Sequence, residues 1–372
     1  MKKFLITATV QSHICQFHKP LVDILKENGY EIHVAARNNL GEKNGLRLDF
    51  ADKVFDVPFE RSPFSVKNVI AYKKLKKIIN SENYNLISCN TPVGGLLTRI
   101  AALGKRKHGT KVFYTAHGFH FYKGAPLKNW LLYYPVEWLC SLFTDVIVTI
   151  NEEDYYFAQK KFPCKVTRIH GVGVDPIRYR PAEKEEKNAI RKELGFEENE
   201  KIILCVGELL PNKNQAMLID SMKLVIRESP ETKVVFAGNG PEKERLEKKA
   251  KENGLEKNVV FLGYCTTLEV YQKAADISVS CSIREGLGLN LIEAMFSGNP
   301  IVATSNRGHD ELVNLGQNGF LVKVGEKEKL AEKILYFINN PEESAKMGLK
   351  GMEIAEKYSL PEVKKELEKI YN

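Results

Sequence analysis

Two alternating sequence patterns limit the folds open to this chain. Short apolar runs rich in β-branched residues are followed by longer amphipathic stretches, such as 17–29, several of which end on glycine. The runs are 3–10, 31–37, 86–90, 111–117, 145–150, 201–209, 233–238, 259–264, 276–282 and 300–305. Apolar runs of this kind predict strands that are buried on both faces, and their alternation with helices predicts parallel sheets. The runs form one set in each half of the chain. We therefore predict an α/β protein with two doubly wound, Rossmann-like domains.

The boundary between these domains is expected near residue 172. A chain of 372 residues is long enough for two domains of ordinary size. Gly171, Gly173, Pro176 and Pro181 interrupt the pattern there, and a charged stretch follows them. We therefore predict an N-terminal domain over 1–172 and a C-terminal domain over 173–372.

Positive charge is concentrated in the first half of the chain. The net charge is +8, and residues 1–172 hold 25 of the 55 Lys and Arg residues but only 14 of the 47 Asp and Glu residues. This favours an anionic partner such as a phosphate, an acidic lipid or a nucleic acid, or else indicates a solvated lysine-rich face. The basic clusters lack interleaved aromatic residues, which argues against nucleic acid.

Other bulk features are typical of a cytosolic protein. The seven cysteines are widely spaced and include no Cys-x-x-Cys pair, so we expect reduced thiols and neither a disulfide framework nor a zinc knuckle. No apolar run reaches the length of a membrane helix. The N-terminal run is interpreted as a buried strand and not as a signal peptide.

Two glutamates eight residues apart flank a glycine-bearing segment after a predicted strand. Glu285 follows the strand, and Glu293 lies about one turn inside a helix expected to begin near Leu289. The segment 286–289 can expose backbone amides to an anion at the start of that helix. A carboxylate near the same point can accept hydrogen bonds from vicinal hydroxyls. This combination suits a sugar nucleotide, although ordinary polar loop residues would have the same spacing.

Two further loops of the second half follow predicted strands. In the first, Gly207 is followed by Asn212 and Lys213, a lysine placed to bind phosphate. In the second, Gly240 precedes Pro241 at a predicted helix start. Neither loop has the Gly-Lys-Ser/Thr of a Walker loop or the third glycine of a dinucleotide fingerprint.

In the first half, histidines follow two predicted strands. His117 and His120 come after one of them, and Ser12, His13 and His18 come after the first strand of the chain. These side chains can hydrogen-bond a sugar or can be structural. The stretch 127–143 is rich in Leu, Trp and Tyr, which is typical of a packing helix or of a helix at a membrane interface.

Taken together, these motifs resemble the retaining glycosyltransferases of family four, which have the GT-B fold. The similarity rests on Glu285-x7-Glu293, on GNGP at 238–241, on Lys213, on HGVGVD at the domain boundary and on His117. It spans nearly the whole chain. The segments TAHGFHFYKGA and VGELLPNKNQ are similar to those of bacterial exopolysaccharide and capsule enzymes that extend lipid-linked sugars.

The resemblance implies two domains facing across a cleft, with the last helix packing back on the N-terminal domain. It also implies roles for particular residues, with His117 and Glu285 as catalytic residues and no metal or cofactor. The donor-binding residues that it implies are Lys213, Asn212, Gly207, Gly240, Gly286, Leu287, Gly288, Leu289 and Glu293. On the acceptor side it implies Ser12, His13 and His120.

The sequence departs from the family pattern at two places. Glu208 stands after Gly207, where many relatives have an arginine, so Arg284 or Arg307 is a candidate replacement for the missing phosphate cation. The first-domain Gly-Gly loop of many relatives is replaced by TVQSHICQFH. This second departure affects the region expected to approach the acceptor or the diphosphate.

The function implied is transfer of a hexose or N-acetylhexosamine, with retention, from a UDP-sugar to a lipid-pyrophosphate-linked saccharide. Such an enzyme would work in the cytoplasm at the inner face of the cell membrane, in the synthesis of a surface polysaccharide. Two alternatives remain, a non-catalytic sugar-nucleotide-binding protein and a nicotinamide-dependent dehydrogenase. The missing dinucleotide fingerprint counts against the second alternative.

Overall fold

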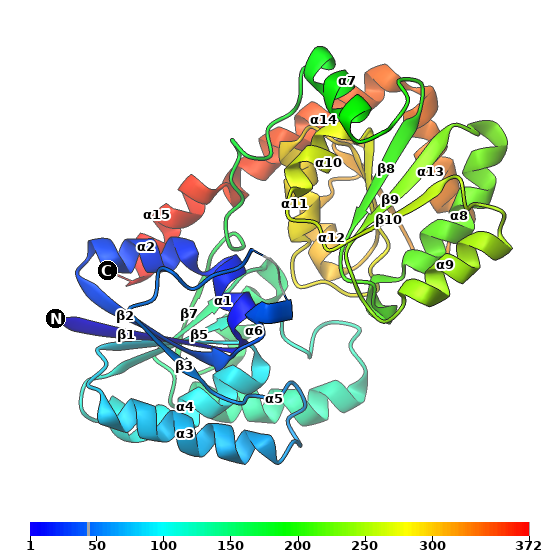
Figure 1. The fold of residues 1–372 in the computed structure, drawn as a ribbon. Helices are drawn as coiled ribbons and strands as arrows, with labels where there is room; N and C mark the ends of the chain where they lie inside the picture. The colour runs from blue at the N-terminus through cyan, green and yellow to red at the C-terminus, as the bar shows by residue number, and fades with distance from the viewer. Residues whose placement is uncertain (43–44, 372) are drawn as a thin grey trace. The chain divides into compact units, whose positions relative to one another are not determined.

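The computed structural model describes residues 1–42 and 45–371, which divide into two compact units. Unit 1 comprises Met1–Gly173 together with the C-terminal segment that begins at Leu360, and unit 2 comprises Val174–Ser359. The division after Gly173 lies one residue beyond the predicted boundary. Each unit contains one fully parallel sheet with helices on both faces, as predicted (Figure 1).

The sheet of unit 1 has seven strands in the order β3-β2-β1-β4-β5-β6-β7. Its strands are β1 (Lys2–Val10), β2 (Tyr30–Arg37), β3 (Lys53–Asp56), β4 (Leu86–Asn90), β5 (Lys111–Ala116), β6 (Val146–Thr149) and β7 (Lys165–Arg168). The central strand β4 is buried along its whole length. The order reverses between β1 and β4, which is the point where ligands bind in doubly wound sheets, beyond the carboxyl ends of the strands.

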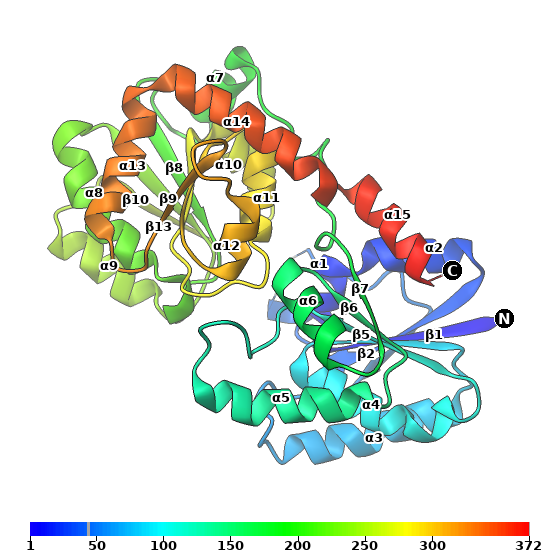
Figure 2. The ribbon, with the colours of Figure 1, turned by 180° about the vertical axis from the view of Figure 1, so that it is seen from behind.

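Helices connect these strands and cover both faces of the sheet. They are α1 (Gln11–Phe17), α2 (Lys19–Glu27), α3 (Lys67–Ser81), α4 (Pro92–Arg106), α5 (Leu127–Ser141), α6 (Glu152–Lys161) and α15 (Leu360–Tyr371). Helices α3 and α4 lie on one face, and α2 and α15 lie on the other (Figures 1 and 2). A 3-10 turn, Leu40–Glu42, follows β2.

The C-terminal helix α15 packs on unit 1. Its buried residues Val363, Leu367 and Tyr371 repeat every four positions and form one apolar stripe. The ring of Tyr371 lies 5.1 Å from that of Phe113, and its hydroxyl lies 3.3 Å from Ser88 Oγ. The last helix of the chain is therefore part of the first unit.

The sheet of unit 2 has six strands in the order β10-β9-β8-β11-β12-β13, which is again a Rossmann-like order. Its strands are β8 (Lys201–Val206), β9 (Thr232–Ala237), β10 (Val259–Gly263), β11 (Ile277–Ser280), β12 (Ile301–Thr304) and β13 (Gly319–Val322). Here the order reverses between β8 and β11. The loops after these two strands are those with Lys213 and Glu285.

The helices of unit 2 also cover both faces of its sheet. They are α7 (Lys184–Glu193), α8 (Gln215–Glu228), α9 (Lys243–Glu252), α10 (Leu268–Ala274), α11 (Leu289–Phe296), α12 (Arg307–Leu312), α13 (Lys327–Asn339) and α14 (Pro341–Ala355). Short 3-10 turns cover Pro211–Lys213 and Glu356–Tyr358. Apolar residues of α8, α9, α13 and α14 form the main core against one face, while α10 packs on the other.

Three strands of the structure are missing from the sequence prediction. They are β3, β7 and β13, and each consists of four residues at or near the edge of its sheet. Three of the four residues of β3 are exposed, so its sequence lacks the continuous apolar character by which the other strands were predicted. The amphipathic segment 17–29 was predicted as a helix and contains α2, whereas α1, which precedes it, was not predicted.

The structure also describes the cysteines and the length and polarity of the helices. All seven cysteines are free thiols. Within residues 1–42 and 45–371, every helix is too short or too polar to cross a bilayer.

Candidate functional site

In unit 2, the loops after β8 and β11 are joined at the carboxyl ends of these strands. Lys213 Nζ lies 2.5 Å from Glu285 Oε1, in an ion pair between two largely buried side chains. The carbonyl of Asn212 accepts a 2.8 Å hydrogen bond from the Ile283 amide, and Asn212 Nδ2 donates one of 3.0 Å to the Arg284 carbonyl. Two residues predicted at separate loops are thus brought together, and Asn212 fixes one loop to the other.

Glycines allow the β8 and β9 loops to approach each other closely. A Cβ atom on Gly238 would lie 2.0 Å from the Gly207 carbonyl oxygen, and one on Gly240 would lie 2.2 Å from the Leu209 carbonyl oxygen. The Leu209 amide donates a 2.9 Å hydrogen bond to the Asn239 carbonyl across this contact. The structure therefore gives Gly240 a packing role, and its contact with a donor stays a prediction.

Helix α11 begins directly after the glycine-bearing segment. Gly288 is its N-cap, and its carbonyl accepts hydrogen bonds from the amides of Leu291 and Ile292 at 2.9 and 3.2 Å. The preceding amides of Leu289 and Asn290 have no acceptor within the helix, because the first amides of any helix lack one. Together with the helix dipole, they provide a site for an anion at the end of β11.

Glu293 lies in the second turn of α11 and is partly buried. Burial raises the pKa of its carboxyl to about 7, and a hydrogen bond from the Tyr179 hydroxyl opposes that rise. Burial and the charge of Glu293 in turn raise the pKa of Tyr179. Nearby, Arg178 donates hydrogen bonds of 3.0 and 2.7 Å to Glu269. Glu293, which is predicted to bind ribose hydroxyls, thus accepts a hydrogen bond from a tyrosine that lies 114 positions earlier in the sequence.

Helix α12 completes this edge of the sheet and was not part of the sequence prediction. The Asn306 side chain caps it by accepting hydrogen bonds from the amides of Gly308 and His309, at 3.1 and 3.2 Å. A Cβ atom on Gly308 would lie 2.9 Å from Glu285 Cβ, so the helix start packs directly on Glu285. Arg307 Nε donates to the Glu285 carbonyl at 3.4 Å, which places this candidate phosphate cation beside the ion pair.

In unit 1, His13 and His117 meet at the carboxyl ends of β1 and β5. Their Nε2 atoms lie 3.3 Å apart, and His117 Nε2 also lies 3.3 Å from Asn90 Oδ1 at the end of β4. His18 is close to both, with its ring centroid 5.3 Å from that of His13 and 5.4 Å from that of His117. Burial lowers the pKa of His117 to about 4 and holds those of His13 and His18 well below the usual range.

The other two acceptor-side predictions lie apart from this histidine pair. Ser12 is buried, and its Oγ accepts a 2.8 Å hydrogen bond from Asn39 Nδ2. The ring of His120 stacks against Tyr133 of α5, with centroids 4.6 Å apart. The structure therefore groups His13 with His117 and separates them from His120. His18, which follows the first strand together with His13, lies beside this pair.

The backbone beside His117 has an unusual conformation. Thr91, which follows Asn90, has φ of +63°, a region that β-branched residues rarely adopt. Its Oγ1 accepts a 3.1 Å hydrogen bond from the Thr9 amide and lies 2.7 Å from Thr9 Oγ1. Such strain persists where surrounding contacts fix the backbone, and it is frequent at functional sites.

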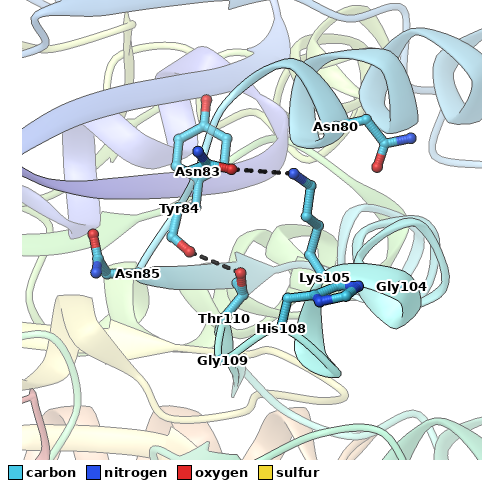
Figure 3. Close-up of a pocket in the computed structure, with 9 residues that line it drawn as sticks. All are labelled: Asn80, Asn83, Tyr84, Asn85, Gly104, Lys105, His108, Gly109 and Thr110. Atoms are coloured by element: carbon cyan, nitrogen blue, oxygen red, sulfur yellow. Dashed lines mark hydrogen bonds between the residues drawn. The ribbon is translucent and has the colours of Figure 1, made fainter.

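A surface pocket of about 770 Å³ lies elsewhere in unit 1, near the amino ends of β4 and β5. Its lining is polar and includes Asn80, Asn83 and Asn85. Lys105 Nζ donates a 3.3 Å hydrogen bond to Asn83 Oδ1 across it (Figure 3). None of the predicted site residues is among the nine that line it. Ligands of doubly wound sheets bind at the opposite, carboxyl ends of the strands, so this pocket is not our candidate site.

Comparison with known proteins identifies the family. Residues 4–151 match the family described as "Glycosyl transferase 4-like", and residues 186–353 match "Glycosyl transferases group 1". The putative glycosyltransferase EpsD of Bacillus subtilis is 42% identical over 373 residues, covering 100% of this chain and 96% of EpsD. An Escherichia coli UDP-Gal:alpha-D-GlcNAc-diphosphoundecaprenol alpha-1,3-galactosyltransferase is 27% identical, covering 78% of this chain and 76% of that enzyme.

Solved structures show the same fold. HepE of Anabaena, in complex with UDP and glucose, superposes with a TM-score of 0.82 at 20% identity, over 100% of this chain and 99% of HepE. WaaG, a glycosyltransferase involved in lipopolysaccharide biosynthesis, gives a TM-score of 0.77 at 16% identity, over 99% of this chain and 100% of WaaG. With two Rossmann-like units and matches along both of them, this chain belongs to the group 1, family-four-like glycosyltransferases of the GT-B fold.

Proposed function

We propose that this glycosyltransferase uses a UDP-sugar as its donor and binds it at the carboxyl edge of the unit 2 sheet. The observation that supports this most is the arrangement of Lys213, Glu285 and Glu293 at the ends of neighbouring strands. It combines a cation for a diphosphate with carboxylates for hydroxyl groups. One protein similar in structure and one similar in sequence fit this donor class, since HepE was crystallised with UDP and glucose and the E. coli enzyme is named for UDP-Gal.

In this proposal the diphosphate takes over Lys213 from Glu285. The diphosphate of a UDP-sugar carries two negative charges and therefore attracts the ammonium more strongly than one carboxylate does. Glu285 is then released to accept hydrogen bonds from hydroxyls of the donor sugar. The amides at the start of α11, with Gly286, Leu287 and Gly288 before it, contact the sugar and phosphates, while Gly207 leaves room for Lys213. We propose that no metal takes part in donor binding, because this cation and these amides stabilise the leaving diphosphate.

Glu293 is proposed to bind the ribose of the nucleotide. As a carboxylate it can accept hydrogen bonds from both ribose hydroxyls. Because the pKa of the Glu293 carboxyl is about 7, this group is protonated in a substantial fraction of the molecules near neutral pH. In those molecules the proton has to leave before the donor binds. We further propose that His117 acts on the donor sugar and that transfer retains the anomeric configuration, as the family motif implies.

For the acceptor we propose a lipid-pyrophosphate-linked saccharide at an anionic membrane surface. Exposed apolar side chains are concentrated on α5, where Leu127 is 73% exposed, Leu131 71% and Leu139 55%. Lys123 and Lys128 are exposed on and just before the same helix. Apolar and basic side chains presented together are typical of helices that lie at a membrane interface. A role in surface-polysaccharide synthesis at the inner face of the membrane fits this acceptor.

The proposal is tested by measuring product formation and not binding alone. The purified protein is incubated with individual UDP-sugars and a diphosphoundecaprenol-linked saccharide in vesicles of phosphatidylglycerol and phosphatidylcholine. Both UDP release and the extended lipid product are measured, and NMR of the product gives the anomeric configuration. We expect transfer with retention. UDP binding without any product from this acceptor class would favour the non-catalytic alternative and contradict the proposal.

The membrane component has its own test. Replacing Leu131 by Glu places a charge within the exposed apolar surface of α5, and vesicle co-sedimentation should fall several-fold. Leu349→Glu is the matched control, because Leu349 is 64% exposed on α14 in the other unit. If both variants sediment with vesicles to the same extent as wild type, α5 does not contact the membrane.

A further inference from the structure

His309 on α12 lies beneath the glycine-bearing segment 286–289 of unit 2. Its side chain is fully buried, and a Cβ atom on Gly288 would lie only 3.2 Å from its Cδ2 atom. The neighbouring Gly308 packs on the same segment, since a Cβ atom there would lie 3.1 Å from both the Glu285 carbonyl oxygen and the Leu287 amide nitrogen. The histidine ring therefore supports the backbone that leads from Glu285 to the start of α11.

One nitrogen of the His309 ring is hydrogen-bonded and the other is not. Nδ1 lies 2.6 Å from the Thr304 carbonyl oxygen, so it carries a proton and donates it to that hydrogen bond. Burial lowers the pKa of His309, which keeps the ring neutral near neutral pH. In a neutral ring with a proton on Nδ1, the Nε2 atom has a lone pair and can only accept a hydrogen bond. No donor reaches Nε2 from the part of the chain that the structure describes.

The unpartnered nitrogen is on the side of the ring that faces the segment. In an imidazole ring, the bond between Nε2 and Cδ2 is the one opposite Nδ1. Nδ1 is directed at the end of β12 and Cδ2 lies against Gly288, so the edge with Nε2 is turned towards the start of α11. The charges of Glu285 and Lys213 both act on the pKa of His309, as expected of a ring close to their ion pair.

The segment itself contains amides that have no acceptor in the backbone. Within residues 1–42 and 45–371, the amides of Gly286, Leu287 and Gly288 donate to no backbone carbonyl. The first amides of α11 have no acceptor within the helix either. A buried acceptor without a donor costs free energy, and a hydrogen bond from one of these amides would remove that cost. The ring and the segment above it are therefore complementary but not yet joined.

We propose that His309 is a positioning residue of the donor site, whose Nε2 atom accepts a hydrogen bond from a backbone amide of 287–289 once a diphosphate is bound. The diphosphate binds the amides that face outward, which fixes the backbone, and His309 binds one that faces inward. His309 does not touch the donor, because its side chain is fully buried. This inference rests on the proposed function, since it assumes a diphosphate at the start of α11.

Two substitutions at position 309 separate the roles of the two ring nitrogens. The amide of an asparagine side chain reaches about as far as Nδ1 and can donate to the Thr304 carbonyl. The amide of a glutamine side chain reaches about as far as Nε2 and presents an acceptor there. If His309 only fixes the start of α12 through Thr304, His309→Asn should be the milder change. If it acts through Nε2, His309→Gln should be the milder change.

UDP binding and hydrogen exchange are measured on the full-length protein at pH 8, where Glu293 is ionised. UDP is the probe, because every donor of the proposed class contains its diphosphate. We expect UDP to slow amide exchange in peptides covering 284–292 in wild type and in His309→Gln, but several-fold less in His309→Asn. The dissociation constant of UDP should rise about tenfold in His309→Asn, as for loss of a buried hydrogen bond, and clearly less in His309→Gln.

A second readout uses the wild-type protein alone, in case a variant at position 309 does not fold. In ¹⁵N NMR of labelled imidazoles, the Nε2 resonance of His309 should shift when UDP binds, because accepting a hydrogen bond changes the shielding of a lone-pair nitrogen. Thermal unfolding checks the fold of each variant. His108→Gln, at an exposed histidine in the other unit, is the control and should bind UDP as the unit 2 site of wild type does.

Three results would overturn the proposal. They are wild-type UDP affinity and exchange in His309→Asn, a milder effect of His309→Asn than of His309→Gln, and an Nε2 resonance that UDP leaves unchanged. A wild-type protein that does not bind UDP would contradict the proposed function, and this inference with it. A wild-type protein that binds UDP without a change at His309 would contradict this inference alone.

Discussion

The two sheets collect polar side chains at equivalent edges, but the two groups of side chains differ in charge. Both sheets reverse their strand order next to the first strand of the unit, and both have candidate site residues after the strands at that point. In unit 2, Lys213 and Glu285 form an ion pair and Glu293 titrates near neutral pH. In unit 1, three histidines are neutral and face one another.

This difference in charge indicates which kind of ligand each edge can bind. The unit 2 edge is arranged for a ligand with both negative charge and hydroxyl groups, because it holds a cation and carboxylates that can exchange partners. The three histidines at the unit 1 edge are uncharged at neutral pH, because burial lowers their pKa values.

Removing the charge of Glu285 should have the largest effect. In Glu285→Gln, we expect transfer to fall on the order of 10²–10³-fold, the size typical of removing one preorganised electrostatic contact. UDP should bind at least as tightly as to wild type, because Lys213 no longer has a carboxylate partner. Initial rates and calorimetric titration measure the two quantities. Glu328→Gln, at an exposed position of α13, is the control, and unimpaired transfer by Glu285→Gln would remove Glu285 from the proposed mechanism.

The raised pKa of Glu293 should make donor binding depend on pH. If only the carboxylate binds the ribose, protonation at pH 6 weakens binding about tenfold relative to pH 8, since the pKa is about 7. UDP-glucose is the better probe, because its diphosphate does not titrate in this range as the terminal phosphate of UDP does. The dependence should vanish in Glu293→Gln. A flat profile for the wild type would contradict the ribose assignment.

The same pKa has a consequence for stability. A carboxyl group with a raised pKa binds its proton more tightly in the folded state than in the unfolded state, so it lowers stability as pH rises from about 4.5 to about 7. Tyr179 opposes that rise in pKa through its hydrogen bond. In Tyr179→Phe the midpoint of the binding profile should therefore move to higher pH, and UDP-glucose affinity at pH 7 should fall a few-fold. Tyr336→Phe on α13 is the control, and an unshifted midpoint would mean that this hydrogen bond does not set the pKa.

Asn212 should contribute to stability more than to chemistry. Its side chain donates one hydrogen bond to the Arg284 carbonyl, and losing such a bond costs about 1 kcal/mol. For units of this size, we expect Asn212→Ala to lower the melting temperature by about 2–4 °C. A larger loss of donor affinity than of stability would instead show that Asn212 contacts the donor, as the family motif implies.

The smallest expected effect concerns His117, whose ring should not titrate near neutral pH in the folded protein. Because burial lowers the pKa of His117 to about 4, its ring should stay neutral from pH 8 down to about pH 5. Its folded pKa lies below the ordinary value of 6.5, so stability should be lost only as pH falls from about 6.5 towards 4. NMR of ¹⁵N-labelled imidazoles measures this, with the urea-unfolded protein as reference. A His117 ring that titrates near 6.5 in the folded protein would contradict the neutral cluster.

The sequence was informative where function depends on local patterns. Strands with continuous apolar character, the loops after them and the pair Glu285 and Glu293 are all visible within a few residues of one another. The short edge strands were missed, because β3 has three exposed residues out of four and therefore no apolar run.

Contacts between distant segments could not be predicted in the same way. Nothing near Glu293 in the sequence points to Tyr179, and nothing near His117 points to His18. His18 meets His117 because parallel strands bring their carboxyl ends to one edge, whichever part of the chain they come from. Tyr179 instead lies in the segment before α7, which is held against the end of α11 by a 3.0 Å hydrogen bond from Ser297 Oγ to the Tyr179 carbonyl. The cap of α12 by Asn306 is local, but its packing on Glu285 depends on β12 lying beside β11.

We propose that unit 2 recognises a uridine nucleotide through Glu293. This recognition is tested most directly by thermal unfolding of wild type and Glu293→Ala with UDP, GDP, ADP, NADH and UDP-sugars. A ligand at a hundred times its dissociation constant adds about 2.7 kcal/mol, which raises the midpoint by about 5 °C or more. We expect a rise with UDP and its sugars that is lost in Glu293→Ala. A rise with NADH alone, or an equal rise with UDP in both proteins, would contradict it.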